Sequence, residues 1–482
     1  MSTALLWLRR DLRLADHPAL TAAAAHGRVL PVYIDAPEEE APWTPGGASR
    51  WWLHHSLSAL QASLAERGLP LVIRRGESLA TLRALVKESG ATAVFWSRLY
   101  EPAIMARDTA IKSALREDGL IAESSNAALL FEPWQTQTGS GDPYRVFTPF
   151  WKNCAARLDQ QPAPLPVPEA LRAPAKVPHG MTVDELGLLP TLPWAGGLAA
   201  TWTPGEAGAM DRLESFIDGP MPAYSDDRNR PDLPATSFLS PHLHFGELSP
   251  RQALAATRAA VLKGGRAGIA HGSEHFVREL GWREFNHHLL YHFPHTTDAP
   301  LDVRFANLVW RTDARLLEAW QRGRTGYPIV DAGMRELWQT GYMHNRVRMI
   351  AASLLVKNLG QSWLEGAKWF WDTLVDADLP NNTAGWQWTA GCGADAAPYY
   401  RIFNPVLQTE RFDPHRRYLR RWLPEIAALP DEYIHRPWEA PPAVWREAGL
   451  TPGKEYPLPA VDFRASRDAA LGAYEAVKAT QR

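Results

Sequence analysis

The sequence has only two cysteines in 482 residues, Cys154 and Cys392. They lie far apart, and no histidine or second cysteine stands beside either one at the spacing of a metal site. The sequence therefore predicts neither a disulfide framework nor a bound metal. Because thiols without partners suit a reducing compartment, we expect a cytoplasmic protein.

Long apolar runs are absent as well. No segment approaches the ~20 consecutive apolar residues that span a bilayer. The amino-terminal MSTALLWLRRDLRL places its arginines after a short apolar run, which is the reverse of a secretory signal. We therefore expect a soluble protein with no membrane span and no cleaved leader.

The chain also has no excess of charge of one sign, since 51 basic and 53 acidic residues give a net charge of -2. Such a chain does not coat nucleic acid indiscriminately, so any DNA contact must be local. One candidate positive rim is the segment 401–421, and a solvated surface segment is the alternative. Its arginines are Arg401, Arg411, Arg416, Arg417, Arg420 and Arg421.

Tryptophan, in contrast, is abundant, with 21 residues in a chain that is 45% hydrophobic. A hydrophobic core alone does not require so many indoles, and we expect some of them to take part in chemistry. The length exceeds what one core usually serves, so the sequence predicts two domains.

Four short apolar runs, at residues 4–8, 29–34, 70–74 and 92–96, alternate with stretches of helical spacing. This alternation is typical of βαβ units and predicts a doubly wound α/β domain with a parallel sheet over residues 1–135. A ligand would bind at the carboxyl ends of the strands. The dinucleotide fingerprint GxGxxG is missing.

The next part of the chain is rich in proline and glycine, and we interpret residues 136–205 as an interdomain linker. From residue 206 to residue 482 only helical spacing remains. The sequence therefore predicts a second, all-α domain.

The segment DADLPNNTAGWQW, residues 376–388, combines carboxylates, amides and indoles around a turn. Asp376 and Asp378 suit the ring or ribose donors of a flavin, Asn382 suits its redox-active nitrogen, and Trp386 and Trp388 are stackable, oxidisable rings. The alternative is a solvated helix end with aromatic core residues.

This segment and four others resemble the DNA photolyase and cryptochrome family, flavoproteins that use blue light, over about residues 4–425. The others are LLWLRRDLRLADHPAL near the amino terminus, ELGWREF (279–285), YMHNRVRMIAASLLVK (342–357) and DAAPYYRIFNP (395–405). Two further segments, PEEEAPWTPGGASRWWL (37–53) and LLFEPW (129–134), resemble those of the class III photolyases, which are related to plant cryptochromes. The resemblance implies bound FAD.

The resemblance also implies the residues that hold FAD. Those expected at its phosphates are Tyr224, Thr236, Ser237, Ser240 and Arg283, and Leu239 is expected among the other FAD-binding residues. The hydroxyls alone would also suit a capping segment. Those expected around the rest of the flavin are Asn345, Arg348, Asp376, Asp378 and Asn382. Arg348 is expected to pair with Asp376.

In the family, a flipped cyclobutane pyrimidine dimer binds beside the flavin. The positions that correspond to its pocket are Glu279, Trp282, Asn345, Met349 and Trp388, and those at DNA phosphates are Arg346 and Arg401. Without the resemblance, the four-residue spacing of Glu279 and Arg283 would indicate a surface ion pair beside a core tryptophan. Trp386, Trp363 and Trp310 match the electron-transfer triad, with Trp386 nearest the flavin.

The function implied is light-dependent repair of these dimers in DNA by electron transfer from photoexcited FADH⁻, performed by a monomer. Asn345 follows His344 where enzymes for the 6-4 photoproduct carry paired histidines, which favours cyclobutane dimers. One alternative is a cryptochrome photoreceptor without repair activity. Asn382 stands where plant cryptochromes carry Asp, and we expect no long polar signalling tail. The other alternative is a dark electron-transfer flavoprotein.

The resemblance leaves the antenna chromophore open. Ala103 and Ile104 stand where some folate-binding photolyases carry Asn and Glu, so that binding mode is not expected. The similarity to class III enzymes around Trp51 and Trp52 favours methenyltetrahydrofolate in a different pose, with 8-hydroxydeazaflavin as the alternative. The two indoles would equally suit an ordinary interface, and the antenna site could also be empty.

Overall fold

The computed structural model describes residues 2–396 and 400–479, so part of the segment 395–405 lies outside the described residues. The chain divides into two compact units. The first unit consists of Met1–Pro222, Ser237–Pro294 and Val375–Pro380, and the second of Ala223–Thr236, His295–Leu374 and Asn381–Arg482. No described helix is both long enough and apolar enough to cross a bilayer.

The first unit contains a five-stranded parallel sheet in the order β3-β2-β1-β4-β5, which confirms the predicted α/β fold. The strands are β1 (Thr3–Leu8), β2 (Arg28–Asp35), β3 (Val72–Arg75), β4 (Ala93–Ser97) and β5 (Ile121–Ser125). The four apolar runs became the first four strands. The fifth strand was not predicted, because only Ala122 of its five residues is buried.

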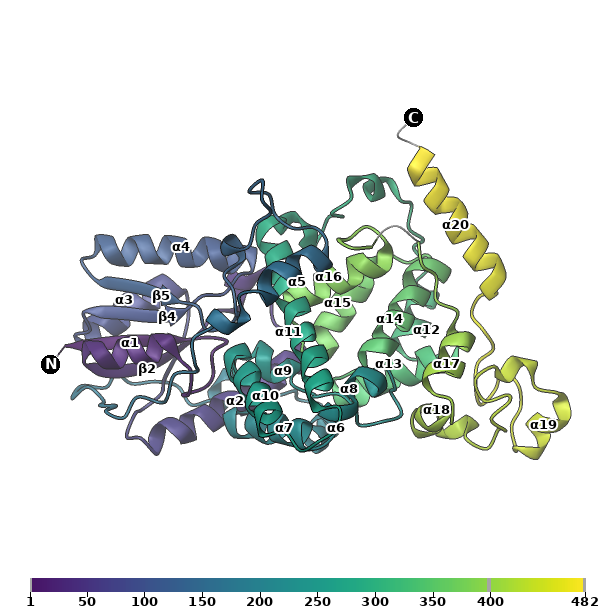
Figure 1. Cartoon of the computed structure of the whole chain (residues 1–482), viewed down its shortest axis with the longest axis horizontal. Helices are drawn as coiled ribbons and strands as arrows, with labels where there is room; N and C mark the ends of the chain where they lie inside the picture. The colour runs from purple at the N-terminus through teal and green to yellow at the C-terminus, as the bar shows by residue number, and fades with distance from the viewer. Residues whose placement is uncertain (1, 397–399, 480–482) are drawn as a thin grey trace. The chain divides into compact units, whose positions relative to one another are not determined.

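Helices connect these strands: α1 (Pro18–His26), α2 (Gly47–Ala65), α3 (Ser78–Ser89) and α4 (Pro102–Glu117). Right-handed crossovers in opposite directions from β1 place helices on both faces of the sheet. Figure 1 shows α1 and α4 on opposite sides of the strands. From β1 the chain adds β2 and β3 on one side and then crosses to add β4 and β5 on the other side. The carboxyl ends of β1 and β4 therefore form the switch point at which ligands bind in such sheets.

The remainder of the first unit is helical. Its helices are α5 (Phe147–Ala155), α6 (Gly196–Thr201), α7 (Glu206–Asp218), α9 (Ser240–His244), α10 (Pro250–Lys263) and α11 (Ile269–His292). Helix α5 lies within the segment that we predicted as a linker, and it packs on α11. This close approach requires Gly281, because a Cβ there would lie 2.3 Å from the ring of Trp151.

The second unit is helical, as predicted for the second domain (Figure 1). Its helices are α8 (Tyr224–Asp227), α12 (Ala314–Gln321), α13 (Pro328–Thr340), α14 (Asn345–Ser353), α15 (Trp363–Thr373), α17 (Pro405–Phe412), α18 (Arg417–Trp422), α19 (Pro442–Glu447) and α20 (Phe463–Ala479), and a π-helical turn at Leu354–Asn358 follows α14. Helix α16 (Leu379–Ala390) begins in the first unit and continues in the second.

Candidate functional site

Helix α9 contacts both predicted carboxylates of the segment 376–378. The Ser240 hydroxyl donates a hydrogen bond of 2.7 Å to Oδ2 of Asp376. Nδ1 of His244 lies 3.2 Å from Oδ1 of Asp378, and both of these side chains are buried. Three predicted flavin residues, Ser240, Asp376 and Asp378, therefore lie together in the first unit, with His244 as an additional member.

Asp378 is held as a carboxylate in this buried position. Burial alone would raise its pKa, but His287, His244 and Arg283 together hold the pKa well below the usual range. Burial lowers the pKa of His287, and the charge of Asp378 opposes that shift. A buried carboxylate surrounded by donors suits a polar ring that presents N–H groups.

The backbone just before α9 has an uncommon conformation. Phe238 has a φ of 55°, in the left-handed region that a bulky residue rarely adopts, and such outliers cluster at ligand sites. Its ring packs against Trp202 at 5.9 Å, and the guanidinium of Arg212 lies 5.6 Å from its centroid. This turn presents the hydroxyls predicted at the phosphates: Ser237 is half-buried and Ser240 exposed, while Leu239 is buried.

Helix α11 carries Arg283 and, beside it, an acidic residue that the sequence analysis did not select. Arg283 donates to the backbone oxygen of Ala128 at 2.6 Å. The buried Glu284 accepts hydrogen bonds from the backbone N–H groups of Leu130 and Phe131. Burial raises its pKa to about 7. These contacts fix α11 to the segment that follows β5.

The indole of Trp282 is stacked on Phe147, with ring centroids 3.7 Å apart and planes inclined by 8°. Phe147 is in turn stacked on Trp151 at 6.3 Å. We call Trp282, Phe147 and Trp151 the aromatic ladder. Its middle ring, Phe147, covers one face of Trp282. Glu279 lies on the same helix and, like Trp282, is half-buried.

In the second unit, α14 positions several other predicted residues. His344 caps the helix, its Nδ1 accepting from the Arg346 N–H at 3.1 Å. The Arg348 Nε donates to the backbone oxygen of Met343 at 2.6 Å. Asn345 is exposed and Met349 half-buried, so both remain available for ligand contacts. The pairing of Arg348 with Asp376 stays a prediction.

Arg346 lies in a cluster of positive charge within the second unit. It donates to Oδ1 of Asn229 at 2.8 Å, and its guanidinium lies 4.4 Å from the ring centroid of Phe412. Burial lowers the pKa of Arg346, and the nearby Arg228 and Arg411 lower it further. Repulsion of this kind among arginines favours an anionic ligand. Tyr224 lies near the same cluster, 5.6 Å below the guanidinium of Arg228.

The carboxyl-terminal part of α16 and the chain after it bring two further predicted residues together. The guanidinium of Arg401 lies 5.9 Å from the ring centroid of Trp388. Trp388 is half-buried and Arg401 exposed. At the start of the same helix, Asn382 donates its amide to the backbone oxygen of Ala367 at 3.0 Å, which fixes the plane of the amide.

The three predicted electron-transfer tryptophans lie in adjoining segments of the second unit. Trp386 packs so closely on Gly366 that a Cβ there would lie 2.1 Å from the indole. Gly366 is three residues after Trp363 on α15. The backbone of Arg311, next to Trp310, donates to Gly360 at 2.8 Å, just before α15. Trp386 and Trp363 are buried, and Trp310 is half-buried.

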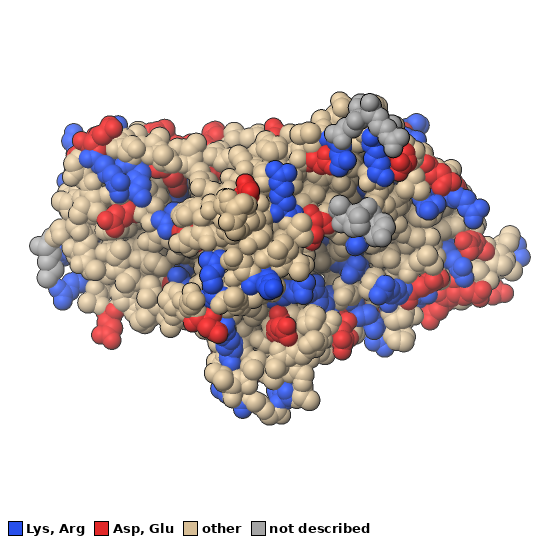
Figure 2. Space-filling model, turned by 45° about the horizontal axis from the view of Figure 1, so that its top comes forward, with Lys and Arg blue, Asp and Glu red and all other residues tan. Residues whose placement is uncertain are grey.

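The predicted positive rim at 401–421 is only partly a surface feature. Arg416 is buried and donates to the backbone oxygens of Asp413, Thr409 and Asp431. Arg420 pairs with Asp431 at 2.6 Å. These two arginines hold the local backbone together, and the exposed members are Arg401, Arg411, Arg417 and Arg421. Figure 2 likewise shows basic side chains in small groups among acidic ones on the face in view.

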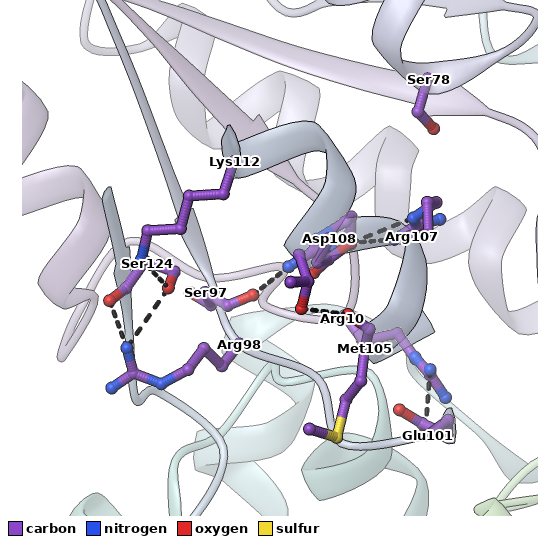
Figure 3. Close-up of polar contacts among 12 residues, drawn as sticks. Arg10, Ser78, Ser97, Arg98, Glu101, Met105, Arg107, Asp108, Lys112 and Ser124 are labelled. Carbon is purple, nitrogen blue, oxygen red and sulfur yellow. Dashed lines mark hydrogen bonds and ion pairs between the residues drawn. The ribbon is translucent and has the colours of Figure 1, made fainter. Parts of the chain in front are cut away.

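A second polar cluster lies at the carboxyl ends of β1, β4 and β5, beneath the first half of α4 (Figure 3). Arg10 pairs with Glu101 at 2.6 Å and Arg9 with Asp108 at 2.5 Å. Lys112 and Arg98 both reach Ser124. Within the described residues, the buried Nε1 of Trp7 has no hydrogen-bond partner.

A short 3-10 helix, η1 (Pro37–Glu40), borders this cluster and packs on α4. Glu39 accepts hydrogen bonds from the backbone N–H and the hydroxyl of Ser78 and from Arg107. Burial raises the pKa of Glu40, and the charge of Glu101 adds to this shift, whereas the charges of Arg10 and Arg107 oppose it. Trp51 and Trp52 of α2 are buried, and the Trp52 indole donates to Glu247 at 2.9 Å.

His244, His287, Phe147 and Glu40 are the site residues that sequence reasoning missed. The sequence could have indicated His244, since this residue follows Ser240 by four positions and lies on the same side of a helix. No sequence pattern indicated Phe147, because its partner Trp282 is distant in the chain.

Comparisons with known proteins agree with this architecture. Residues 276–476 match the family model described as the FAD binding domain of DNA photolyase, and residues 4–169 match the model of DNA photolyase. The chain is 49% identical over 478 residues to a deoxyribodipyrimidine photo-lyase of Agrobacterium fabrum, covering 99% of this chain and 98% of the relative. It is 40% identical over 467 residues to cryptochrome-1 of Arabidopsis thaliana, covering 95% of this chain and 68% of the relative.

Solved structures also resemble the whole chain. The crystal structure of a bacterial class III photolyase from Agrobacterium tumefaciens has a TM-score of 0.95 at 49% identity and covers 99% of this chain and 98% of its own. A cryptochrome from Synechocystis sp. has a TM-score of 0.90 at 28% identity, with coverage of 98% and 99%.

A doubly wound α/β domain joined to an FAD-binding helical domain defines a class of two-domain flavoproteins. The chain belongs to the DNA photolyase family within that class.

Proposed function

We propose that the protein repairs cyclobutane pyrimidine dimers in DNA under blue light, using bound FAD. The observation that carries the proposal is the aromatic ladder. Phe147 covers one face of Trp282, so the opposite face is held ready for a base that leaves the DNA stack. Base flipping is least costly at a damaged step, and stacking offsets the cost by about 1–3 kcal/mol per base.

The chemistry of the donor groups fits FAD. In the first unit, Ser237 and Arg283 are suited to phosphate oxygens, while Ser240 donates to Asp376, and Asp378 is an ionised acceptor for a ring N–H. In the second unit, Asn382 is fixed by Ala367 and is suited to the ring edge. Reduced FAD, when excited by light, supplies the electron that splits the dimer.

DNA binding is proposed for the positive groups of the second unit. Arg346 and Arg401 would contact phosphates, which position the duplex without reading sequence. The relative from Agrobacterium fabrum is named as a deoxyribodipyrimidine photo-lyase, and this name supports the same substrate here. We further propose that the protein is a monomer and that it is located in the cytoplasm. Its two buried cysteines are free thiols, which are compatible with a reducing compartment.

A repair assay tests the function directly. The purified protein with reduced FAD is illuminated with blue light in the presence of an oligonucleotide that contains one thymine dimer. We expect recovery of normal thymine absorbance in the light and none in the dark. Flavin that photoreduces without any repair would favour a cryptochrome, to which the chain is 40% identical. A protein that transfers electrons equally in the dark would favour an electron-transfer flavoprotein.

Trp310→Phe should slow photoreduction of oxidised FAD by at least about tenfold. A hole on an indole moves through closely spaced rings, and Trp310 is the half-buried last member of the series with Trp363 and Trp386. Flavin absorbance is followed under blue light with an external reductant. Trp134→Phe, which changes an exposed indole of the first unit, serves as the control. If Trp310→Phe photoreduces at the wild-type rate, the electron enters by another route.

We propose methenyltetrahydrofolate as the antenna chromophore, bound at the polar cluster of the α/β domain. A pterin presents two adjacent N–H donors on one edge, and a carboxylate such as Glu40 accepts both. A deazaflavin presents only one N–H on the corresponding edge, so a carboxylate would accept one hydrogen bond rather than two. The buried indole N–H of Trp7 offers a further donor to a bound ring.

Glu40→Gln should weaken folate binding about tenfold, because a charge-assisted hydrogen bond contributes about 1.5–3 kcal/mol. Antenna-free protein is titrated with methenyltetrahydrofolate and, separately, with 8-hydroxydeazaflavin, and near-ultraviolet absorbance is measured. Glu38→Gln is the matched control, since Glu38 is exposed on the same short helix. Preference of the wild type for the deazaflavin would remove the folate proposal.

A further inference from the structure

Helix α9 makes two hydrogen bonds to the segment 376–378. Ser240 and His244 are four residues apart and lie on one side of the helix, ~6 Å apart along its axis. Asp376 and Asp378 are two residues apart, and Asp376 lies in a turn. One helical turn reaches both carboxylates, with bonds of 2.7 Å and 3.2 Å. We call this arrangement the α9 clamp.

Asp378 is surrounded by groups from three other elements of the first unit. His244 comes from α9, and His287 and Arg283 come from α11. Arg10, which follows β1, also interacts with Asp378 through its charge. Among the two histidines, only His244 has a ring nitrogen within hydrogen-bond distance of this carboxylate in the described contacts. Nδ1 of His287 is instead 2.9 Å from the backbone oxygen of Arg283.

We propose that His244 is a positioning residue for the flavin. Its Nδ1–H donates to Oδ1 of Asp378, which fixes the rotation of the carboxylate and keeps it ionised toward the ring. This inference rests on the proposed function, since it assumes that FAD binds beside Asp378. His244 itself touches the carboxylate rather than the flavin.

The clamp has a direct electrostatic consequence. An ionised Asp378 beside the ring opposes the negative charge that reduction adds to the flavin. Without His244, one of the interactions that lower the pKa of Asp378 is lost, and burial shifts this pKa upward. A protonated carboxyl no longer opposes reduction, so reduction becomes easier as the pH falls through the new pKa.

The test measures FAD affinity and the flavin midpoint potential in the full-length protein. His244→Ala should weaken FAD binding about tenfold, as expected for the loss of one charge-assisted hydrogen bond. Its midpoint potential should be higher than that of the wild type at the same pH, because the carboxylate is no longer held toward the ring that gains negative charge on reduction. His271→Ala, at an exposed histidine of α11, is the control and should match the wild type in both measurements.

Two amide variants separate positioning from general packing, and they also serve if His244→Ala does not fold. The side-chain N–H of Asn lies close to the place of Nδ1, whereas that of Gln reaches farther. His244→Asn should therefore restore wild-type affinity and potential, and His244→Gln should not. Equal behaviour of Asn and Gln, or an alanine variant with wild-type values, would overturn the inference. A wild-type protein that binds no FAD would instead overturn the proposed function.

Discussion

Asp378→Ala is expected to purify with little or no FAD. The substitution removes a buried carboxylate that lies among His244, His287 and Arg283, so the bound ring would lose its acceptor and His244 would lose its hydrogen-bond partner. A buried group left without a partner costs about 1–3 kcal/mol, and two are affected here. The ratio of flavin absorbance to protein absorbance measures the effect.

Asp378→Asn distinguishes charge from shape in the same experiment. The amide keeps the volume and one acceptor oxygen, but it carries no charge for the surrounding cations. We expect an intermediate flavin content that does not recover at higher pH. A folded alanine variant that retains its full flavin content would exclude Asp378 from the flavin site.

Trp282→Ala is expected to reduce affinity for dimer-containing DNA by about 1–3 kcal/mol and to change affinity for undamaged DNA little. The reason is that a base contacts the free face of this indole only after it has left the stack. Trp282→Phe keeps a ring on Phe147 and should retain much of the preference. Binding is titrated with matched oligonucleotides, with and without a thymine dimer.

Arg401→Ala should weaken DNA binding without changing the preference for the dimer. Its guanidinium is exposed and carries charge without reading a base, so both DNAs should bind more weakly by a similar factor. The salt dependence of binding should decrease by about one ion per lost contact, which titrations at two salt concentrations reveal. A wild type without any preference for the dimer would contradict the repair function and favour a photoreceptor.

The parts of the fold that the sequence predicted are those with strong local periodicity. The apolar runs that became β1, β2 and β4 are nearly continuous because both faces of these parallel strands are buried. β5 lacks this signature, since it alternates buried and exposed residues at the edge of the sheet. The sequence did not predict helix α5, because this short amphipathic helix lies in a segment that is rich in proline and glycine.

The candidate site was predictable only as far as family motifs extend along the chain. Ser240, Asp376 and Asp378 were each selected, but no local pattern indicates that α9 bonds to both carboxylates. For the arginines at 401–421, the sequence instead predicted more surface charge than the structure shows. Their number suggested a positive surface, whereas Arg416 and Arg420 bind backbone oxygens that composition cannot reveal.

The aromatic ladder also restricts how the chain can be divided or redesigned. Phe147 and Trp151 belong to the stretch that looked like a spacer, yet they support a ring on α11 that is more than a hundred residues away. A fragment that begins at residue 206 would carry Trp282 without this support. Replacing residues 147–155 with a neutral flexible spacer would therefore preserve chain connectivity but remove the support of Trp282, and the protein should then lose its preference for damaged DNA.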